Sequence, residues 1–88
     1  MAPSRSREEF MKMLDQEHQW PNWYLFKFIV PRGKEDEVLE LFPEAETSVK
    51  ASSKGKYRSV TAKMMMLSSS DVLDIYEKAG HIEGVIAL

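Results

Sequence analysis

The sequence contains no cysteine among its 88 residues. Without thiols the chain can form no disulfide, no thiolate nucleophile and no cysteine-ligated zinc or iron–sulfur site. This absence fits a reducing compartment, so we expect a cytoplasmic protein. Long apolar runs are also missing, since no segment approaches the ~20 residues that cross a bilayer and the N-terminus lacks the apolar stretch of a signal peptide. We therefore expect no membrane contact.

The remaining composition is that of one small folded domain. Hydrophobic residues make up 43% of the chain, which is too much for a disordered tail. The net charge is only −2, but residues 34–46 carry six acids and one base, and residues 47–66 carry five bases and no acid. This pattern has two interpretations: a solvated acidic helix followed by a hairpin whose charges prevent edge pairing, or a basic patch for an anionic ligand or an acidic protein surface.

Residues 1–21 are expected to form a helical arm in front of a domain over residues 22–88. Ser6 and Glu9 have the spacing of a capping box, and apolar residues follow at helical intervals. Pro21 ends this helix, because proline disfavours the helical conformation of the residue before it.

The domain is expected to run strand, helix, strand, strand, helix, strand. The expected ranges are 23–30 for the first strand, 34–42 for the first helix, 46–52 and 56–67 for a hairpin, a helix capped by Ser68 and ended by a left-handed Gly80, and 82–88 for the last strand. This order is that of a ferredoxin-like α+β sandwich, in which two helices cover one face of four antiparallel strands. Right-handed crossovers place the first and third strands in the centre.

Alternation along the central strands leaves one sheet face open. Met64 and Met66 point inward and Met65 outward. The open face is expected to carry Leu25, Lys27, Ile29, Tyr57, Ser59, Thr61, Lys63 and Met65. An apolar face on so small a domain is usually covered. The candidate covers are a second copy of the chain, a partner protein, or the N-terminal helix acting as a lid.

Three stretches carry a resemblance to a known family. They are Ser52-Ser53-Lys54-Gly55-Lys56-Tyr57-Arg58-Ser59-Val60, Phe26-Lys27-Phe28, and the C-terminal residues Tyr76, Glu77, Gly80, Ile82, Val85 and Leu88. In these stretches, and over about residues 22–88, the chain resembles the YbeD-like family of small bacterial proteins, classed as a domain of unknown function. The resemblance implies a ferredoxin-like fold similar to the ACT domains that bind small effectors in metabolic enzymes. It implies no established activity.

The hairpin tip has a physical interpretation of its own. Gly55 can take the positive φ of a tight turn, and Ser52, Ser53 and Lys54 offer hydroxyls, amides and a charge that could hold an anion. Tyr57 would lie where the hairpin joins the open face. The alternative is that these residues serve only turn formation and cross-strand packing.

The sequence gives little support for catalysis. His81 is expected to cap a helix end, and His18 to lie on the surface of the arm; together they could bind a metal only if the arm folds back. Acylphosphatases share the expected topology and have an arginine after the first strand, where this chain has Arg32. Such an enzyme also needs an asparagine on the second strand, and the only asparagine here is Asn22.

RNA binding by the open face is a further alternative, because Tyr57 lies there with two lysines. The aromatic signature of RNA-recognition sheets is absent, and the net charge of −2 disfavours nucleic acid. The sequence favours a non-catalytic regulatory or adaptor module that needs no cofactor. It is expected to bind a protein partner or a small anionic metabolite, or to form a homodimer through the open face. The expected contact residues are Ser52, Ser53, Lys54, Gly55, Tyr57, Ser59, Lys27 and Lys63.

Overall fold

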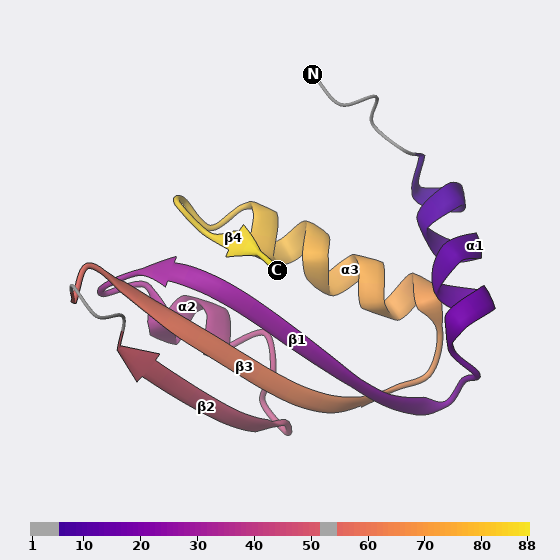
Figure 1. Cartoon of the computed structure of the whole chain (residues 1–88), viewed down its shortest axis with the longest axis horizontal. Coiled ribbons are helices and arrows are strands. Elements are labelled where there is room, and N and C mark those ends of the chain that lie inside the picture. The colour runs from indigo at the N-terminus through magenta and orange to yellow at the C-terminus, as the bar shows by residue number, and fades with distance from the viewer. Residues whose placement is uncertain (1–5, 52–54) are drawn as a thin grey trace.

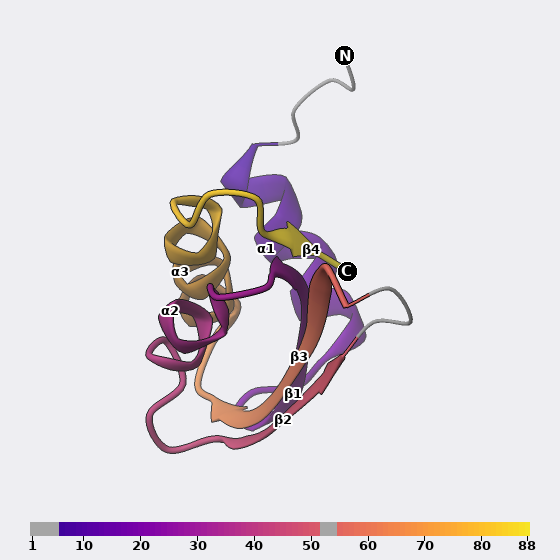
Figure 2. The same cartoon turned by 90° about the vertical axis from the view of Figure 1, so that its left-hand side faces the viewer.

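The computed structural model describes residues 6–51 and 55–88. Its elements are α1 (Arg7–Glu17), β1 (Asn22–Pro31), α2 (Glu35–Leu39), β2 (Glu46–Ala51), β3 (Tyr57–Met66), α3 (Ser69–Gly80) and β4 (Ile86–Ala87). The strands form one antiparallel sheet in the order β2-β3-β1-β4, and α2 and α3 lie on one side of it (Figures 1 and 2). This arrangement confirms the expected ferredoxin-like α+β sandwich with β1 and β3 in its centre. Among the described residues, no helix is long and apolar enough to span a bilayer.

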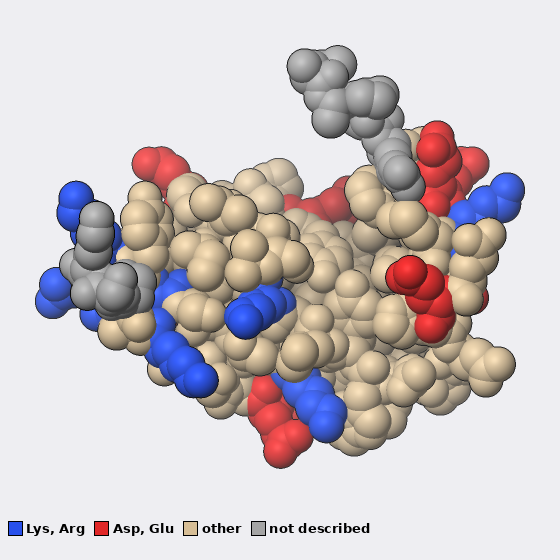
Figure 3. All heavy atoms as spheres, in the orientation of Figure 1, with Lys and Arg blue, Asp and Glu red and all other residues tan. Residues whose placement is uncertain are grey.

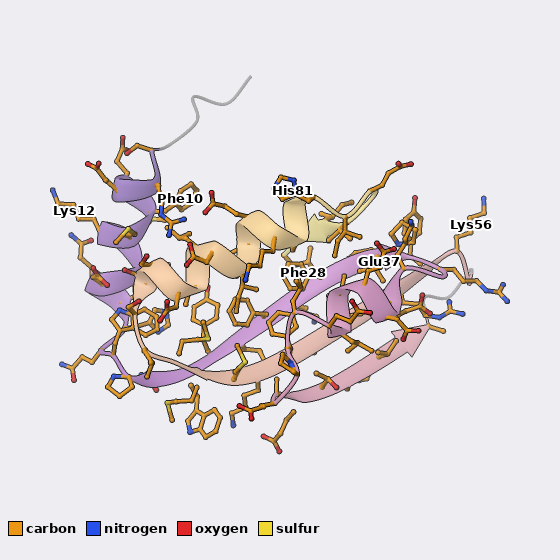
Figure 4. The ribbon with its side chains drawn as sticks, turned by 180° about the vertical axis from the view of Figure 1, so that it is seen from behind. Phe10, Lys12, Phe28, Glu37, Lys56 and His81 are labelled. Atoms are coloured by element: carbon orange, nitrogen blue, oxygen red, sulfur yellow. The ribbon has the colours of Figure 1, made fainter. Side chains whose placement is uncertain are left out.

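The pairing of β1 with β3 forms the middle of the sheet. The two strands pair over ten residues, from Asn22 opposite Met66 to Pro31 opposite Tyr57. On the helical side of this pair, the side chains of Phe26, Phe28 and Val30 from β1 and of Val60 and Ala62 from β3 are completely buried. Figure 4 shows Phe28 on this side of the sheet, among the side chains that fill the space below the helices. Burial of this kind supplies about 1.5 to 3 kcal/mol per large apolar side chain.

The helix α3 begins as expected and ends differently. The Ser68 hydroxyl accepts a hydrogen bond from the Asp71 amide at 3.1 Å, which confirms the predicted N-cap. The prediction of a left-handed Gly80 is wrong, because Gly80 is the last residue of the helix and is not among the glycines with positive φ. The chain after Gly80 instead forms a tighter, 3₁₀-type turn, in which the Ile82 amide donates a hydrogen bond to the Ala79 carbonyl at 3.0 Å. This turn brings Ile82 onto the core.

The last strand and the first domain helix are both shorter than expected. Of the range 82–88, only Ile86 and Ala87 belong to β4, because residues 82–85 form the turn that carries the chain from the helical layer to the sheet. Gly84 makes this turn with a φ of +80°. The helix expected over 34–42 ends at Leu39. Hydrogen bonds from each amide to the carbonyl three residues earlier continue to Phe42, which is still buried.

The N-terminal helix α1 packs on α3 and not on the open face of the sheet. Arg7 forms an ion pair with Asp74 at 2.7 Å and a second one with Glu77, and it donates a hydrogen bond to the Ser70 carbonyl at 3.0 Å. Figures 1 and 2 show α1 beside the start of α3. The structure therefore does not have the lid that was one of three alternatives for covering the open face.

Two glycines allow a test of the turn before β4. Both Gly33 and Gly84 have positive φ, but a methyl group at Gly84 would lie 2.6 Å from Cγ of Pro31, whereas one at Gly33 would meet nothing within 4 Å. We expect Gly33→Ala to lower the free energy of unfolding by about 1 to 2 kcal/mol through backbone strain alone. Gly84→Ala should cost a further ~1 to 3 kcal/mol through the steric clash. Urea unfolding of both variants measures the difference, and equal losses would contradict the close approach.

Candidate functional site

The strand register places the expected open-face residues side by side. Leu25 lies opposite Lys63, Lys27 opposite Thr61, and Ile29 opposite Ser59. Opposed residues of an antiparallel pair point to the same side of the sheet. Tyr57 joins them as the first residue of β3, and Met65 as the last but one. The predicted grouping on one face is therefore confirmed, whereas the role of these residues in binding stays a prediction.

This face is rich in exposed apolar side chains. Leu25 is 60% exposed and Trp23 52% exposed, and Tyr57, Met65 and Ile86 are also exposed. Figure 3, which looks onto this face, shows a mostly uncharged surface in which a few separate Lys and Arg side chains stand out, one of them near the middle. The sequence interpretation missed Trp23 and Ile86. Trp23 could have been found, because it precedes Leu25 by two residues, but the face of Ile86 depends on the register of β4 against β1.

The charged groups of the open face are mostly lysines. Lys27 and Lys63 are exposed, and Lys50 joins them from β2, where it lies opposite Ser59. The Lys63 ammonium lies 5.5 Å from the centre of the Trp23 ring, within the range of a cation–π contact. Glu46, opposite Lys63, is the one acid among the strand residues that the structure places on this face. The face therefore combines an apolar surface with a net positive charge.

The hairpin between β2 and β3 is described only in part. Gly55 has a φ of +73°, as expected for the turn. Ser52, Ser53 and Lys54 lie outside the described residues, so the anion site remains a prediction. The Arg32 amide bonds to the Lys56 carbonyl at 3.0 Å, which brings the loop after β1 next to the hairpin.

The residues considered for catalysis do not come together. Asn22 and Arg32 lie at opposite ends of β1, and ten residues of strand span roughly 30 Å. His18 is half-buried rather than on the surface as expected, because its ring packs against Trp20 and Tyr24 with centroid distances of 5.4 Å. His81 directly follows α3. In the part of the chain that the structure describes, no group of three or more acids and histidines is placed to hold a metal ion.

A family model described as "Protein of unknown function (DUF493)" matches residues 15–88. The chain belongs to this family. The assignment confirms the YbeD-like resemblance, and the match includes the entire sheet with α2 and α3. A search of the curated proteins and of the solved structures finds no match. Because the family description names no activity, the function has to be argued from the surfaces of the domain.

This member of the DUF493 family also has a groove on its helical side. The groove has a volume of about 590 Å³ and lies where α1 meets α3 and β4. Its lining is mostly apolar and consists of Phe10, Met13, Leu14, Glu17, Tyr24, Leu73, Tyr76, Ala87 and Leu88. Figure 4 shows Phe10 on the side of α1 near α3. The apolar stripe of α1 thus borders this groove without filling it.

Two tyrosine hydroxyls meet within the lining of the groove. The hydroxyl oxygens of Tyr24 and Tyr76 are 3.1 Å apart and share a hydrogen bond. Burial raises the pKa of Tyr76 well above the ordinary value of 10.0, and the hydrogen bond to Tyr24 raises it further. The folded protein therefore keeps this proton at pH values at which the unfolded chain releases it.

This pKa shift predicts a loss of stability in alkali. Above pH 10 the unfolded chain binds fewer protons than the folded protein, so the free energy of unfolding should fall as the pH rises. Tyr76→Phe should lower stability by about 1 kcal/mol at pH 7 through the lost hydrogen bond. The same variant should lose less stability than the wild type between pH 10 and pH 12. Urea unfolding across this range measures both slopes, and parallel curves would contradict the buried hydroxyl.

Proposed function

We propose that this domain is a non-catalytic adaptor or regulatory module whose open sheet face binds a partner protein. We further propose that the partner surface has an apolar centre surrounded by acidic side chains. The observation that carries the proposal is the exposed apolar surface of Trp23, Leu25, Tyr57, Met65 and Ile86, which the chain's own α1 leaves uncovered. Exposed apolar patches of this kind are typical of protein interaction sites.

The two kinds of side chain on this face would have different roles. Burial of Trp23, Leu25 and Tyr57 against a partner would supply most of the affinity, and aromatic residues are frequent among those that dominate binding energies. The lysines would contribute more to selection and to the rate of association, because they attract acidic surfaces and repel basic ones. Lys27 lies between Leu25 and Ile29 along β1, so any partner that buries these apolar residues must also accommodate its charge.

A small anionic ligand at the hairpin is the second candidate. The proximity of the β1–α2 loop to the hairpin favours it, because the loop brings Arg32 and the hairpin brings Lys56 to the same end of the sheet. Lys and Arg side chains gather at this end in Figure 3. In this case Ser52 and Ser53 would supply hydroxyls, and Gly55 the turn, as the sequence predicts.

RNA binding receives less support than either candidate. Base stacking on a sheet of this topology uses aromatic side chains that lie close together on the central strands. The two exposed aromatic residues of this face, Trp23 and Tyr57, are eight residue pairs apart along the β1–β3 ladder, which is roughly 26 Å. Two rings this far apart cannot stack neighbouring bases on one surface, and each would make a separate contact with a partner.

The proposal predicts a charge-dependent interaction that maps to the open face. Isotope-labelled protein would be titrated with an RNase-treated macromolecular fraction of a source-cell extract, and in parallel with the metabolite fraction. We expect amide signals of β1 and β3 to broaden with the macromolecular fraction. Lys27→Glu should reduce this effect at least tenfold, because it places an acid opposite an acidic partner. Lys12→Glu is the control, since it makes the same charge change at an exposed site on α1 (Figure 4).

Four results would count against this function. Equal losses in both variants would show that only net charge matters. Broadening that an untreated macromolecular fraction causes and the RNase-treated fraction does not would indicate nucleic acid. Shifts confined to Gly55–Tyr57 with the metabolite fraction would favour the anionic ligand instead. A spectrum unchanged by either fraction would contradict both candidates.

A further inference from the structure

The outer edge of β2 is free of other strands in the part of the chain that the structure describes. β2 is the first strand in the sheet order and pairs only with β3, and all six of its residues are exposed. Figure 1 shows β2 along the lower margin of the sheet, with no element beyond it. An edge strand of this kind presents backbone N–H and C=O groups that can pair with another strand.

The side chains of β2 are complementary to those of a second β2. Glu46, Ser48 and Lys50 lie on the open face, and Thr47 and Val49 lie on the helical face. Two copies can pair edge to edge about a two-fold axis perpendicular to the sheet. Opposed residues must then share a face, so the axis has to lie midway between the two copies of one residue. With the axis at Ser48, Glu46 of each copy lies opposite the partner's Lys50. Val49, which is 41% exposed, then lies opposite the partner's Thr47.

Other centres within β2 are less favourable. An axis at Val49 would put Lys50 opposite the partner's Ser48 and would remove both opposite-charge pairs. An axis at Thr47 would leave only residues 46–48 of the strand in the ladder. Axes at Ser48 and at Val49 both keep five strand residues paired, but of the two only the axis at Ser48 puts two opposite-charge pairs between the copies. Opposite charges directly across a ladder stabilise pairing, and like charges there oppose it.

From this complementarity we infer that the chain forms a two-fold symmetric dimer by antiparallel pairing of β2 with β2 of a second copy. The dimer has one continuous eight-stranded sheet, and both open faces lie on the same side of it. The interface lies along the edge of β2, whereas the exposed apolar residues of the open face belong to β1, β3 and β4, so the inference does not depend on the proposed partner. A short edge contact is smaller than a standard protein interface, and we expect a Kd of roughly 10 to 100 µM.

A pair of charge-reversal variants tests the register directly. A Lys50→Glu chain carries acids at both positions 46 and 50, and a Glu46→Lys chain carries bases at both. Each variant alone should dimerise about tenfold or more weakly than the wild type, because two attractive pairs become repulsive. An equimolar mixture restores both opposite-charge pairs, so the mixed dimer should form with near wild-type affinity. Sedimentation equilibrium measures all three samples, and circular dichroism checks that each variant is folded.

The matched control is Lys27→Glu, which makes the same charge change on β1, away from the edge. It should leave the dimer unchanged, although it is expected to weaken the proposed partner interaction, so the two proposals can fail separately. Glu46 also lies opposite Lys63 of its own chain. If Glu46→Lys impairs folding, the test rests on the other two variants: Lys50→Glu should then dimerise more weakly than Lys27→Glu.

Three outcomes would overturn the inference. The first is a wild-type chain that stays monomeric at about 500 µM, well above the expected Kd. The second is a mixture of two folded variants that associates no better than either alone. The third is a dimer that Lys27→Glu disrupts and Lys50→Glu does not, which would place self-association on the open face.

Discussion

The packing of β1 against β3 is the interaction on which the rest of the structure depends. Phe26, Phe28 and Val30 have their side chains on the helical side of this pair, where they meet Val60 and Ala62 and the apolar sides of α2 and α3. A shift of β1 by one residue would expose these side chains and turn Lys27 toward the core with Leu25 and Ile29. The core therefore sets the register, and the register decides which side chains appear on the open face.

The position of α1 decides whether the open face is available. The stripe of Phe10, Met13 and Leu14 could cover apolar surface on either side of the sheet. The contacts of Arg7 with Ser70, Asp74 and Glu77 of α3 hold α1 at the helical layer instead. The consequence is twofold: Trp23 and Leu25 stay exposed on the sheet, and a mostly apolar groove remains between α1, α3 and β4.

The two edges of the sheet differ in how far they are protected. On one side, β4 pairs with only two residues of β1, and the Leu88 amide adds a hydrogen bond to the Lys27 carbonyl at 2.9 Å. On the other side, the entire outer edge of β2 is available for pairing with another strand in the part of the chain that the structure describes. Lysine on an edge strand normally discourages pairing. In the inferred dimer, however, two-fold symmetry places Glu46 of the second copy opposite Lys50. The same charges can thus disfavour other strands and favour a second copy.

The sequence by itself determined the order of the elements, the central place of β1 and β3, the cap at Ser68 and most of the side chains that β1 and β3 place on the open face. These features follow from local periodicity, capping chemistry and the handedness of crossovers, which act over a few residues or apply to all sheets. The sequence did not determine the end of α3, the length of β4, the surroundings of His18 or the site on which α1 docks. The length of β4 and the docking of α1 depend on contacts between residues distant in the chain, such as Gly84 with Pro31 and Arg7 with Asp74. Only the tertiary structure selects among the surfaces that an apolar stripe or a short strand could occupy.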